Sequence, residues 1–346
     1  MIFNLFYTYS TYLNTHQYNY NNDNNNNNNK QNIVLLGNGF FARGFLHNIN
    51  FNKFNITQIY KDDFINPQDI MYQLQRWGQN QNLEELNKTF HLRDLFKIHS
   101  NHIKIQDEVK SFTYNLKNLK ITGEKHILNY DCDYLVIGIG NKKSLKDWQI
   151  ELNDIINKKQ KVDIVGMGPT GFELANILSK FVQVEMFDSL SKDKAFFYVK
   201  PENKQKILEI LEKKNIKTNY DMSFDHIYEN PLYCFGGAPN KIYNTTLENF
   251  KVNKYLQSTI NPSVYIGGDC VDSKEFVKNA QNAYQQGEYV AKRLNNQISK
   301  SEEYKYKSNG ISLNIGDNKV MIESHNIIPD GIYPDFIIKL YSMFCI

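Results

Sequence analysis

Two glycine turns, each between an apolar run and a helix-like segment, constrain this sequence more than any other feature. The first lies in residues 31–48, where the run from Ile33 to Leu36 meets Gly37 and Gly39, and Ala42 takes the place of a third small residue. In such a unit the first glycine permits the turn, the second admits a pyrophosphate, and the third small residue lets the helix pack on the strand. The helix N-terminus offers amide donors to the anion. The stretch therefore predicts a dinucleotide-binding unit.

The second turn repeats this pattern in full within residues 162–175, with Gly166, Gly168 and Gly171. A predicted strand follows and ends at Asp188, about 20 residues after the glycines, which is where a ribose-binding acid is expected. An Asp in that place repels a 2′-phosphate, so this unit is predicted to favour NADH over NADPH. A single motif of this kind is weak evidence for a nucleotide site. Two copies in one chain make the prediction of dinucleotide binding much stronger.

The first unit departs from the pattern at the end of its second predicted strand, residues 55–60. Tyr60 stands where an acid is expected to bind the adenosine ribose. Asp62 and Asp63 follow at once, and either could substitute from a different starting position. The first nucleotide site is therefore predicted to lack the usual carboxylate.

The rest of the chain predicts further strands and helices in alternation. We expect a disordered Asn-rich tail before residue 31, a helix over 66–99, and a hairpin or meander followed by a buried parallel strand that ends at Gly138 and Gly140. A short charged connector is predicted over 141–161. Later segments are predicted as an amphipathic helix (201–217), two glycine-ended strands (232–237 and 263–268), a helix (277–296), further strands (311–324) and a terminal apolar segment (336–346).

Composition excludes several classes of site. The net charge of +3 in 346 residues argues against a nucleic-acid partner. The four cysteines form no C-x-x-C pair, which disfavours a dithiol redox centre and a zinc site, and the histidines show no ligand spacing. No apolar run approaches the length of a membrane span, and no secretory signal is evident. We expect free thiols in a cytoplasmic protein, with mitochondrial or membrane-peripheral locations as alternatives.

The order of motifs resembles that of the flavoproteins with two dinucleotide-binding domains, and most closely the type II NADH:quinone dehydrogenases. The resemblance rests on GNGFFA, YDCDYLVIGIGN, GMGPTGFELA, FGGAPN, YIGGDC and AQNAYQQG, in that order, and covers roughly residues 31–340. It implies an α/β fold with two Rossmann-like domains, an NAD domain inserted in an FAD domain. The implied boundaries are an Asn-rich tail (1–30), an FAD domain (31–150 and 251–300), an NAD domain (151–250), and C-terminal strands with a terminal apolar helix (301–346).

The resemblance also implies roles for individual residues. Glu173 would orient the nicotinamide, Asp269 would bind the flavin's ribityl chain or pyrophosphate, and Gln281 and Gln285 would hydrogen-bond a quinone-like acceptor. The cofactor-binding residues expected are Gly37, Gly39, Ala42, Val109, Gly140 and Asp269 for FAD, and Gly166, Gly168, Gly171, Asp188 and Gly236 for NADH. Ile139 departs from the family's usual Thr, and the β-meander of the NAD domain is expected to be reduced or absent.

Three functions stay open at this point. The first is hydride transfer from NADH through FAD to a quinone or similar acceptor. The second is an oxidoreductase of the apoptosis-inducing-factor type. The third is a degenerate family member that binds a nucleotide and regulates without turnover, which Tyr60 and the shortened NAD domain motivate. Peripheral membrane contact and a homodimer are left open.

Overall fold

The computed structural model describes residues 30–63, 99–141, 145–222, 228–234, 242, 250–273, 275–317, 319–324 and 330–334. Several expectations fall outside these ranges. They are the Asn-rich tail before Lys30, all but the last residue of the predicted 66–99 helix, Gly236, and the terminal apolar segment.

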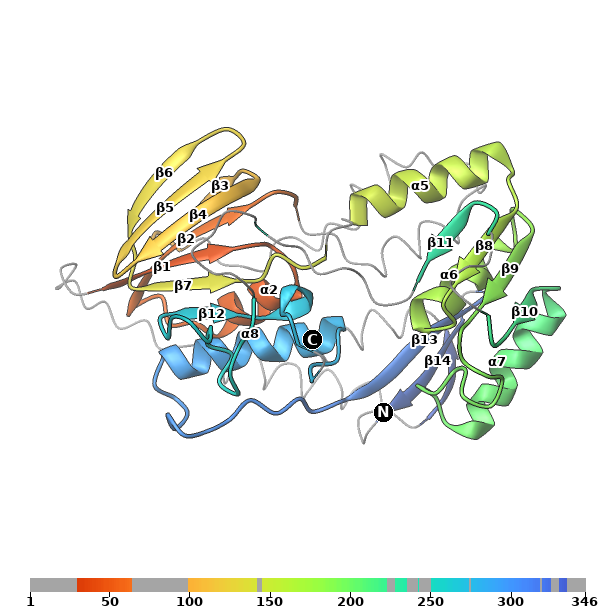
Figure 1. The fold of residues 1–346 in the computed structure, drawn as a ribbon. Coiled ribbons are helices and arrows are strands. Elements are labelled where there is room, and N and C mark those ends of the chain that lie inside the picture. Colours follow the sequence, from red (N-terminus) through yellow and green to blue (C-terminus); the bar gives the residue numbers. More distant parts are fainter. Residues whose placement is uncertain are drawn as a thin grey trace. The chain divides into compact units, whose positions relative to one another are not determined.

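The first sheet is parallel, as the continuous apolar runs predict. Its strands are β1 (Gln31–Leu36), β2 (Phe54–Tyr60), β3 (His102–Gln106), β7 (Tyr134–Ile137) and β12 (Val264–Ile266). Their order is β12-β7-β1-β2-β3 (Figure 1). Strand β12 joins this sheet although the whole second unit lies between β7 and β12 in sequence, so the second domain is inserted in the first.

Alternate side chains of β1 enter two different cores, which explains why the run from Ile33 to Leu36 is wholly apolar. Ile33 and Leu35 pack against helices α2 (Phe40–Asn48) and α8 (Ala280–Leu294). Val34 and Leu36 pack against the antiparallel sheet on the opposite face (Figure 1). That sheet consists of β4 (Val109–Asn115), β5 (Asn118–Gly123) and β6 (Ile127–Asp131), the meander that the alternating pattern predicts.

Helices α2 and α8 approach closely enough to require glycine on both sides. A Cβ atom on Gly44 would lie 2.0 Å from the Tyr284 carbonyl oxygen, and one on Gly287 would lie 2.0 Å from the Phe41 carbonyl oxygen. Neither contact leaves room for a side chain, because both partners are backbone atoms. These two glycines therefore fix the distance between the helices beneath the first glycine turn.

The second sheet is also parallel. It consists of β8 (Val162–Val165), β9 (Val184–Phe187), β10 (Lys217–Asn219) and β11 (Pro231–Tyr233), in the order β10-β9-β8-β11. Helices α6 (Pro169–Leu178) and α7 (Pro201–Lys213) belong to the same unit. The described residues between β10 and β11 are 220–222 and 228–230, and the predicted reduction of the meander stays a prediction.

The C-terminal strands complete the core of this second unit. They are β13 (Gly310–Gly316), β14 (Lys319–Ser324) and β15 (Gly331–Pro334), which form an antiparallel sheet. Leu313, Ile315 and Met321 are buried in one cluster with Phe172 of α6. The second core is thus built from two separate parts of the sequence.

The predicted charged connector is wrong, because residues 145–158 form helix α5 (Leu145–Lys158). Its Leu152, Ile155 and Ile156 lie three and four residues apart on one face and are buried in the second core. The many charged residues on the other face concealed this apolar stripe. The helix also spans the boundary expected between residues 150 and 151.

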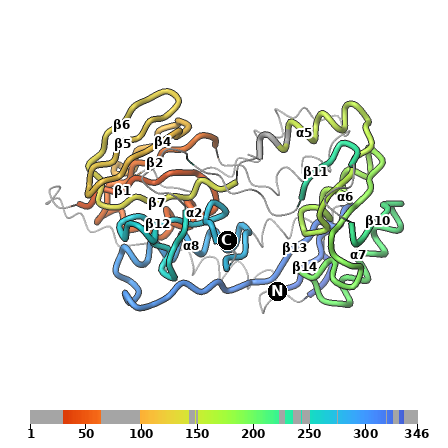
Figure 2. Tube along the Cα trace, in the orientation of Figure 1, coloured from red at the N-terminus to blue at the C-terminus, as the bar shows by residue number. Residues whose placement is uncertain are grey.

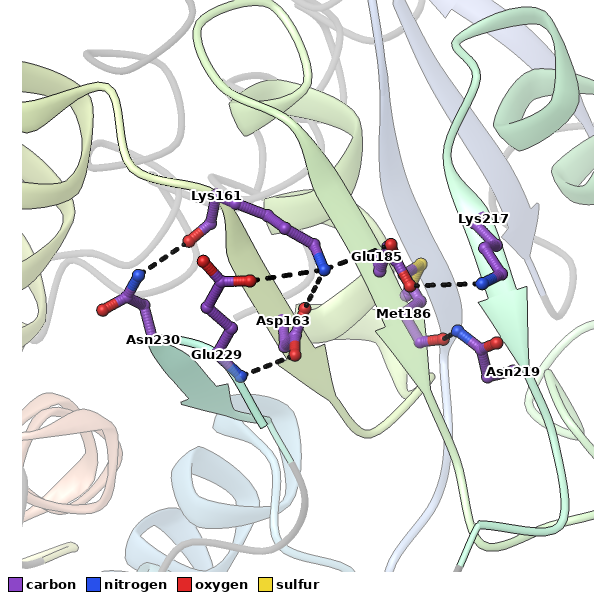
Figure 3. Close-up of polar contacts among 8 residues, drawn as sticks. All are labelled: Lys161, Asp163, Glu185, Met186, Lys217, Asn219, Glu229 and Asn230. Atoms are coloured by element: carbon purple, nitrogen blue, oxygen red, sulfur yellow. Dashed lines mark hydrogen bonds and ion pairs between the residues drawn. The ribbon is translucent and has the colours of Figure 1, made fainter. Parts of the chain in front are cut away.

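A charged network joins the second sheet at the ends of the strands opposite the glycine turn (Figure 3). Lys161 Nζ lies 3.2 Å from a Glu185 carboxylate oxygen, 3.5 Å from one of Glu229 and 3.7 Å from one of Asp163. The Glu229 amide donates to Asp163 at 2.7 Å. Since Lys161 precedes β8 and the glycines follow it, this network supports the sheet and lies away from the nucleotide turn.

Asp107 holds the turn between β5 and β6 with an almost fully buried carboxylate. It accepts hydrogen bonds from the amides of Lys125 (3.1 Å), His126 (3.0 Å) and Glu124 (2.9 Å). Burial alone would raise its pKa, but these hydrogen bonds outweigh burial and hold the pKa below the usual Asp value.

We expect Asp107→Asn to destabilise the protein by about 1–2 kcal/mol at pH 7, because an amide nitrogen would face backbone donors. The carboxylate's contribution is complete above the ordinary Asp pKa of about 4 and disappears as pH falls through the lower folded value. Urea unfolding at pH 7 and pH 3 should show a smaller acid-induced loss in the variant. The exposed Asp131→Asn is the control, and an equal effect of both variants would contradict this role for Asp107.

Candidate functional site

The first glycine turn has the geometry that its sequence predicts. Gly37 adopts φ of +116°, and a Cβ there would lie 2.2 Å from the Gly138 carbonyl oxygen. Ala42 is fully buried against the sheet. Gly39 caps α2, and a Cβ on it would meet no atom within 4 Å. The space in front of this helix N-terminus is therefore open to an anionic group.

The second glycine turn repeats this geometry. Gly166 adopts φ of +107°, and a Cβ on Gly171 would lie 2.0 Å from the Gly166 carbonyl oxygen, so the helix packs directly on the strand. Gly168 caps α6, and the nearest atom to a Cβ there is the Cys234 carbonyl oxygen at 3.8 Å. Asp188 follows β9 and accepts a hydrogen bond from the Met167 amide at 2.7 Å. A carboxylate thus lies beside the second turn.

A backbone hydrogen bond common to both turns shows which residue of the first unit matches Asp188. The Gly166 amide donates to Phe187, the residue before Asp188, and the Gly37 amide donates to Ile59, the residue before Tyr60. Tyr60 therefore occupies the equivalent position, and the first unit has no carboxylate there.

Gln58 supports the first turn instead, a role that the sequence motifs do not predict. Its side chain is fully buried in β2, and its Nε2 donates to the Gly37 carbonyl oxygen at 2.9 Å and to Asn38 Oδ1 at 3.1 Å. A nitrogen of His102 lies 3.0 Å from its Oε1. β2 also contains Asn55 and Thr57, so Gln58 does not stand out in the sequence as the buried polar residue of this strand.

Asp269 lies beside a second residue that the sequence did not single out. Asn141 Nδ2 donates to its Oδ2 at 2.8 Å, which links the ends of β7 and β12. Burial raises the pKa of Asp269. Asn141 Oδ1 is buried and has no hydrogen-bond partner among the described residues. A polyhydroxyl chain such as that of a flavin would supply the missing donor, so these residues fit that group.

The ring of Phe41 fills the space beside two strand-end glycines. A Cβ on Gly138 would lie 2.3 Å from a ring carbon of Phe41, and one on Gly267 would lie 2.0 Å from another. Gly138 therefore admits this ring, whereas Gly140 (φ +68°) has open space around its Cβ position. Of these three glycines, Gly140 is the one with room for a ligand. Val109, also predicted to bind the cofactor, is half-buried at the start of β4.

Glu173 lies on α6, two residues beyond Gly171, and faces the C-terminal strands. Its Oε1 accepts a hydrogen bond from the Asn314 amide of β13 at 2.8 Å. Burial raises the pKa of Glu173 to about 7, against the opposing effect of that hydrogen bond. The Tyr198 hydroxyl is buried without a hydrogen-bond partner in the described residues, and its pKa is raised by burial and by the charges of Glu173 and Asp188.

Gln281 and Gln285 both contact the segment that leaves α8. Gln281 Oε1 accepts from the Tyr306 hydroxyl and the Asn309 amide, each at 2.8 Å. Gln285 exchanges two hydrogen bonds with the backbone of Lys307. That Gln281 and Gln285 hydrogen-bond an electron acceptor stays a prediction.

The described cysteines, Cys132, Cys234 and Cys270, are free thiols. Burial raises the pKa of Cys132 to about 12 and that of Cys270 to about 11, which makes both poor nucleophiles. Within the described ranges, no group of three or more His, Cys, Asp or Glu is placed to hold a metal, and none of the helices there could cross a bilayer.

Comparison with known proteins identifies the architecture. No protein-family model matches the sequence, and neither does any curated protein. Among solved structures, NDH2 from Plasmodium falciparum in complex with NADH has a TM-score of 0.67 and 14% identity over 92% of this chain and 95% of its own. A NAD-dependent persulfide reductase from A. fulgidus has a TM-score of 0.63 and 17% identity, over 85% of this chain and 64% of its own.

The water-forming NADH oxidase from Lactobacillus brevis has a TM-score of 0.61 and 15% identity, over 85% of this chain and 75% of its own. Identities this low establish the fold alone. The chain therefore has the two-domain α/β fold that these solved structures share.

Proposed function

We propose that this protein is an FAD-dependent oxidoreductase that takes a hydride from NADH and passes electrons to a quinone-like acceptor. The observation that carries the proposal is the pair of glycine turns. Each begins a helix at a glycine, Gly39 or Gly168, whose Cβ position has no close neighbour. The similar structures include an NDH2 and an NADH oxidase, each in complex with NADH, which supports the same reading.

The residues have distinct roles in this proposal. The Gly37–Gly39 turn and Asp269 with Asn141 hold the flavin, which supplies the hydride-accepting chemistry when bound. The Gly166–Gly171 turn holds the pyrophosphate of NADH, and Asp188 accepts hydrogen bonds from its ribose. Glu173, with a pKa near 7, binds the nicotinamide amide in either protonation state and sets the orientation of the ring.

An absorbance spectrum before and after anaerobic NADH tests this function directly. The purified protein should be yellow, and NADH should bleach the flavin band. A colourless protein that cannot be reconstituted with FAD would rule the proposal out. Comparing a soluble quinone with oxygen and other soluble acceptors then separates quinone reduction from the apoptosis-inducing-factor type of activity.

We expect Asp188→Ala to weaken NADH binding about tenfold and to bring NADPH binding close to that of NADH. The variant loses a charged acceptor for the ribose and the repulsion of a 2′-phosphate. Fluorescence titration with both nucleotides measures the ratio. Asp193→Ala, an exposed carboxylate five residues further on, is the control. An unchanged ratio in Asp188→Ala would place the ribose elsewhere.

Tyr60 supports a second candidate, a nucleotide-binding or regulatory protein without turnover. The first turn has Gln58 and Tyr60 where the second has a carboxylate, so the adenosine ribose of FAD loses a usual partner. NADH binding without reduction of any acceptor would support this candidate. Measurable turnover would exclude it.

A further inference from the structure

The segment that leaves α8 is held by side chains of that helix before it becomes β13, a path that Figure 2 traces. Gln285 Nε2 donates to the Lys307 carbonyl oxygen at 2.8 Å, and Gln285 Oε1 accepts from the Lys307 amide at 3.0 Å. One side chain thus pairs with both backbone groups of a single residue, which fixes the register of the segment on the helix.

Gln281 adds a second attachment one helical turn earlier. Its Oε1 accepts from the Tyr306 hydroxyl and from the Asn309 amide. Asn279 Nδ2, at the start of the helix, donates to the same Tyr306 oxygen at 3.3 Å. The acceptor oxygens of Gln281 and Gln285 are both engaged by the protein's own chain.

The other end of this segment is held by α6 in a similar way. Glu173 Oε1 accepts from the Asn314 amide at 2.8 Å, and Asn176 Nδ2 donates to the Asn314 carbonyl oxygen at 3.3 Å. Asn314 follows Asn309 by five residues, so their backbone attachment points lie within about 18 Å of each other. The strand therefore links α8 of the first unit to Glu173 of the second.

We propose that Gln281 and Gln285 are positioning residues that clamp Tyr306–Asn309 to α8, so that the strand continuing from this segment presents the Asn314 amide to Glu173. The role of Glu173 toward nicotinamide rests on the proposed function, whereas the clamp does not. The glutamines act through Glu173 and make no direct contact with the acceptor. A slip by one residue would turn the Asn314 amide away from the carboxylate.

Trypsin tests the clamp without any cofactor, because Lys307 is exposed and its peptide bond is a cleavage site. In the wild type, cleavage after Lys307 should be slow, since both of its backbone groups are paired. Trypsin should cleave the Gln285→Ala variant after Lys307 at least tenfold faster than it cleaves the wild type. Gln205→Ala, on the exposed face of α7, is the matched control and should not change the rate. An unchanged rate in Gln285→Ala would overturn the proposal.

Carbon-13 NMR of labelled glutamate side chains tests the link to Glu173, with Glu173→Gln to assign the signal. If the Asn314 amide turns away in Gln285→Ala, the pKa of Glu173 should rise above its value of about 7, because burial then acts without the opposing hydrogen bond. The titratable groups around α6 include Tyr198 and Asp188, Lys214, which contacts the Asn176 carbonyl oxygen, and Lys180, which pairs with Asp317. None of them is changed in this variant.

The two roles of the glutamines predict different kinetics. Positioning predicts a shifted pH profile and a raised KM for NADH in Gln285→Ala. Acceptor binding predicts a raised KM for quinone with an unmoved Glu173 titration, which would overturn the proposal. A wild-type protein that binds no NADH would overturn the proposed function instead, and cleavage and titration would still decide on the clamp.

Discussion

Gly287→Ala should destabilise the first unit by about 3 kcal/mol, a large effect for the addition of one methyl group. The new Cβ would lie 2.0 Å from the Phe41 carbonyl oxygen and 2.7 Å from the Phe45 amide nitrogen. Backbone atoms cannot rotate away, so α2 and α8 must separate and lose contacts along their length. Thermal unfolding followed by circular dichroism measures the effect.

The matched control for this variant is Gly39→Ala. A Cβ on Gly39 would meet no atom within 4 Å, and its φ of −83° suits any residue, so the melting temperature of the flavin-free protein should not change. Gly287→Ala should also weaken flavin binding, since the neighbouring Gln286 accepts a hydrogen bond from the Gly268 amide beside Asp269. Equal stability of the two variants would mean that the helices are not in close contact.

Gly39→Val should reduce flavin affinity roughly a hundredfold while leaving the fold intact. The valine side chain would project into the open space at the N-terminus of α2, where the proposed pyrophosphate approaches the backbone. A hundredfold loss corresponds to about 2.7 kcal/mol of binding free energy. The flavin content of the purified protein and titration of the apoprotein with FAD measure it.

The matched control here is Gly168→Val, which makes the same change at the N-terminus of α6. It should weaken NADH binding and spare the flavin, whereas Gly39→Val should do the reverse. The two variants together assign each turn to its nucleotide. Retention of stoichiometric flavin by Gly39→Val would show that the first turn does not hold it, even if the protein binds NADH normally.

The local features of this fold were predictable because they depend on short stretches of sequence. Gly37 and Gly166 adopt positive φ, which glycine allows, and the apolar runs before them are typical of buried parallel strands. Each of these local structures can therefore be predicted from a few neighbouring residues. Helix α5 was not predictable in the same way. Its buried residues Leu152, Ile155 and Ile156 are separated by charged and polar residues, so the sequence shows no clear apolar periodicity.

Contacts between distant residues were not predictable from the sequence. Nothing near Gly287 in sequence shows that it meets Phe41, and nothing near Glu173 shows that it binds Asn314. The predicted glutamines at 281 and 285 were found from a motif, yet their partners lie on a segment that no local pattern connects to them. Side-chain roles therefore depend on tertiary packing that single-sequence patterns do not encode.

The interleaving of both units has a consequence for synthesis on the ribosome. The first sheet needs β12 and α8, and the core of the second unit needs β13 and β14, all of which emerge late. A nascent chain that ends near residue 250 therefore exposes apolar faces on both halves. Such faces attract chaperones and aggregate readily, so co-translational folding of this protein must wait for nearly the whole chain.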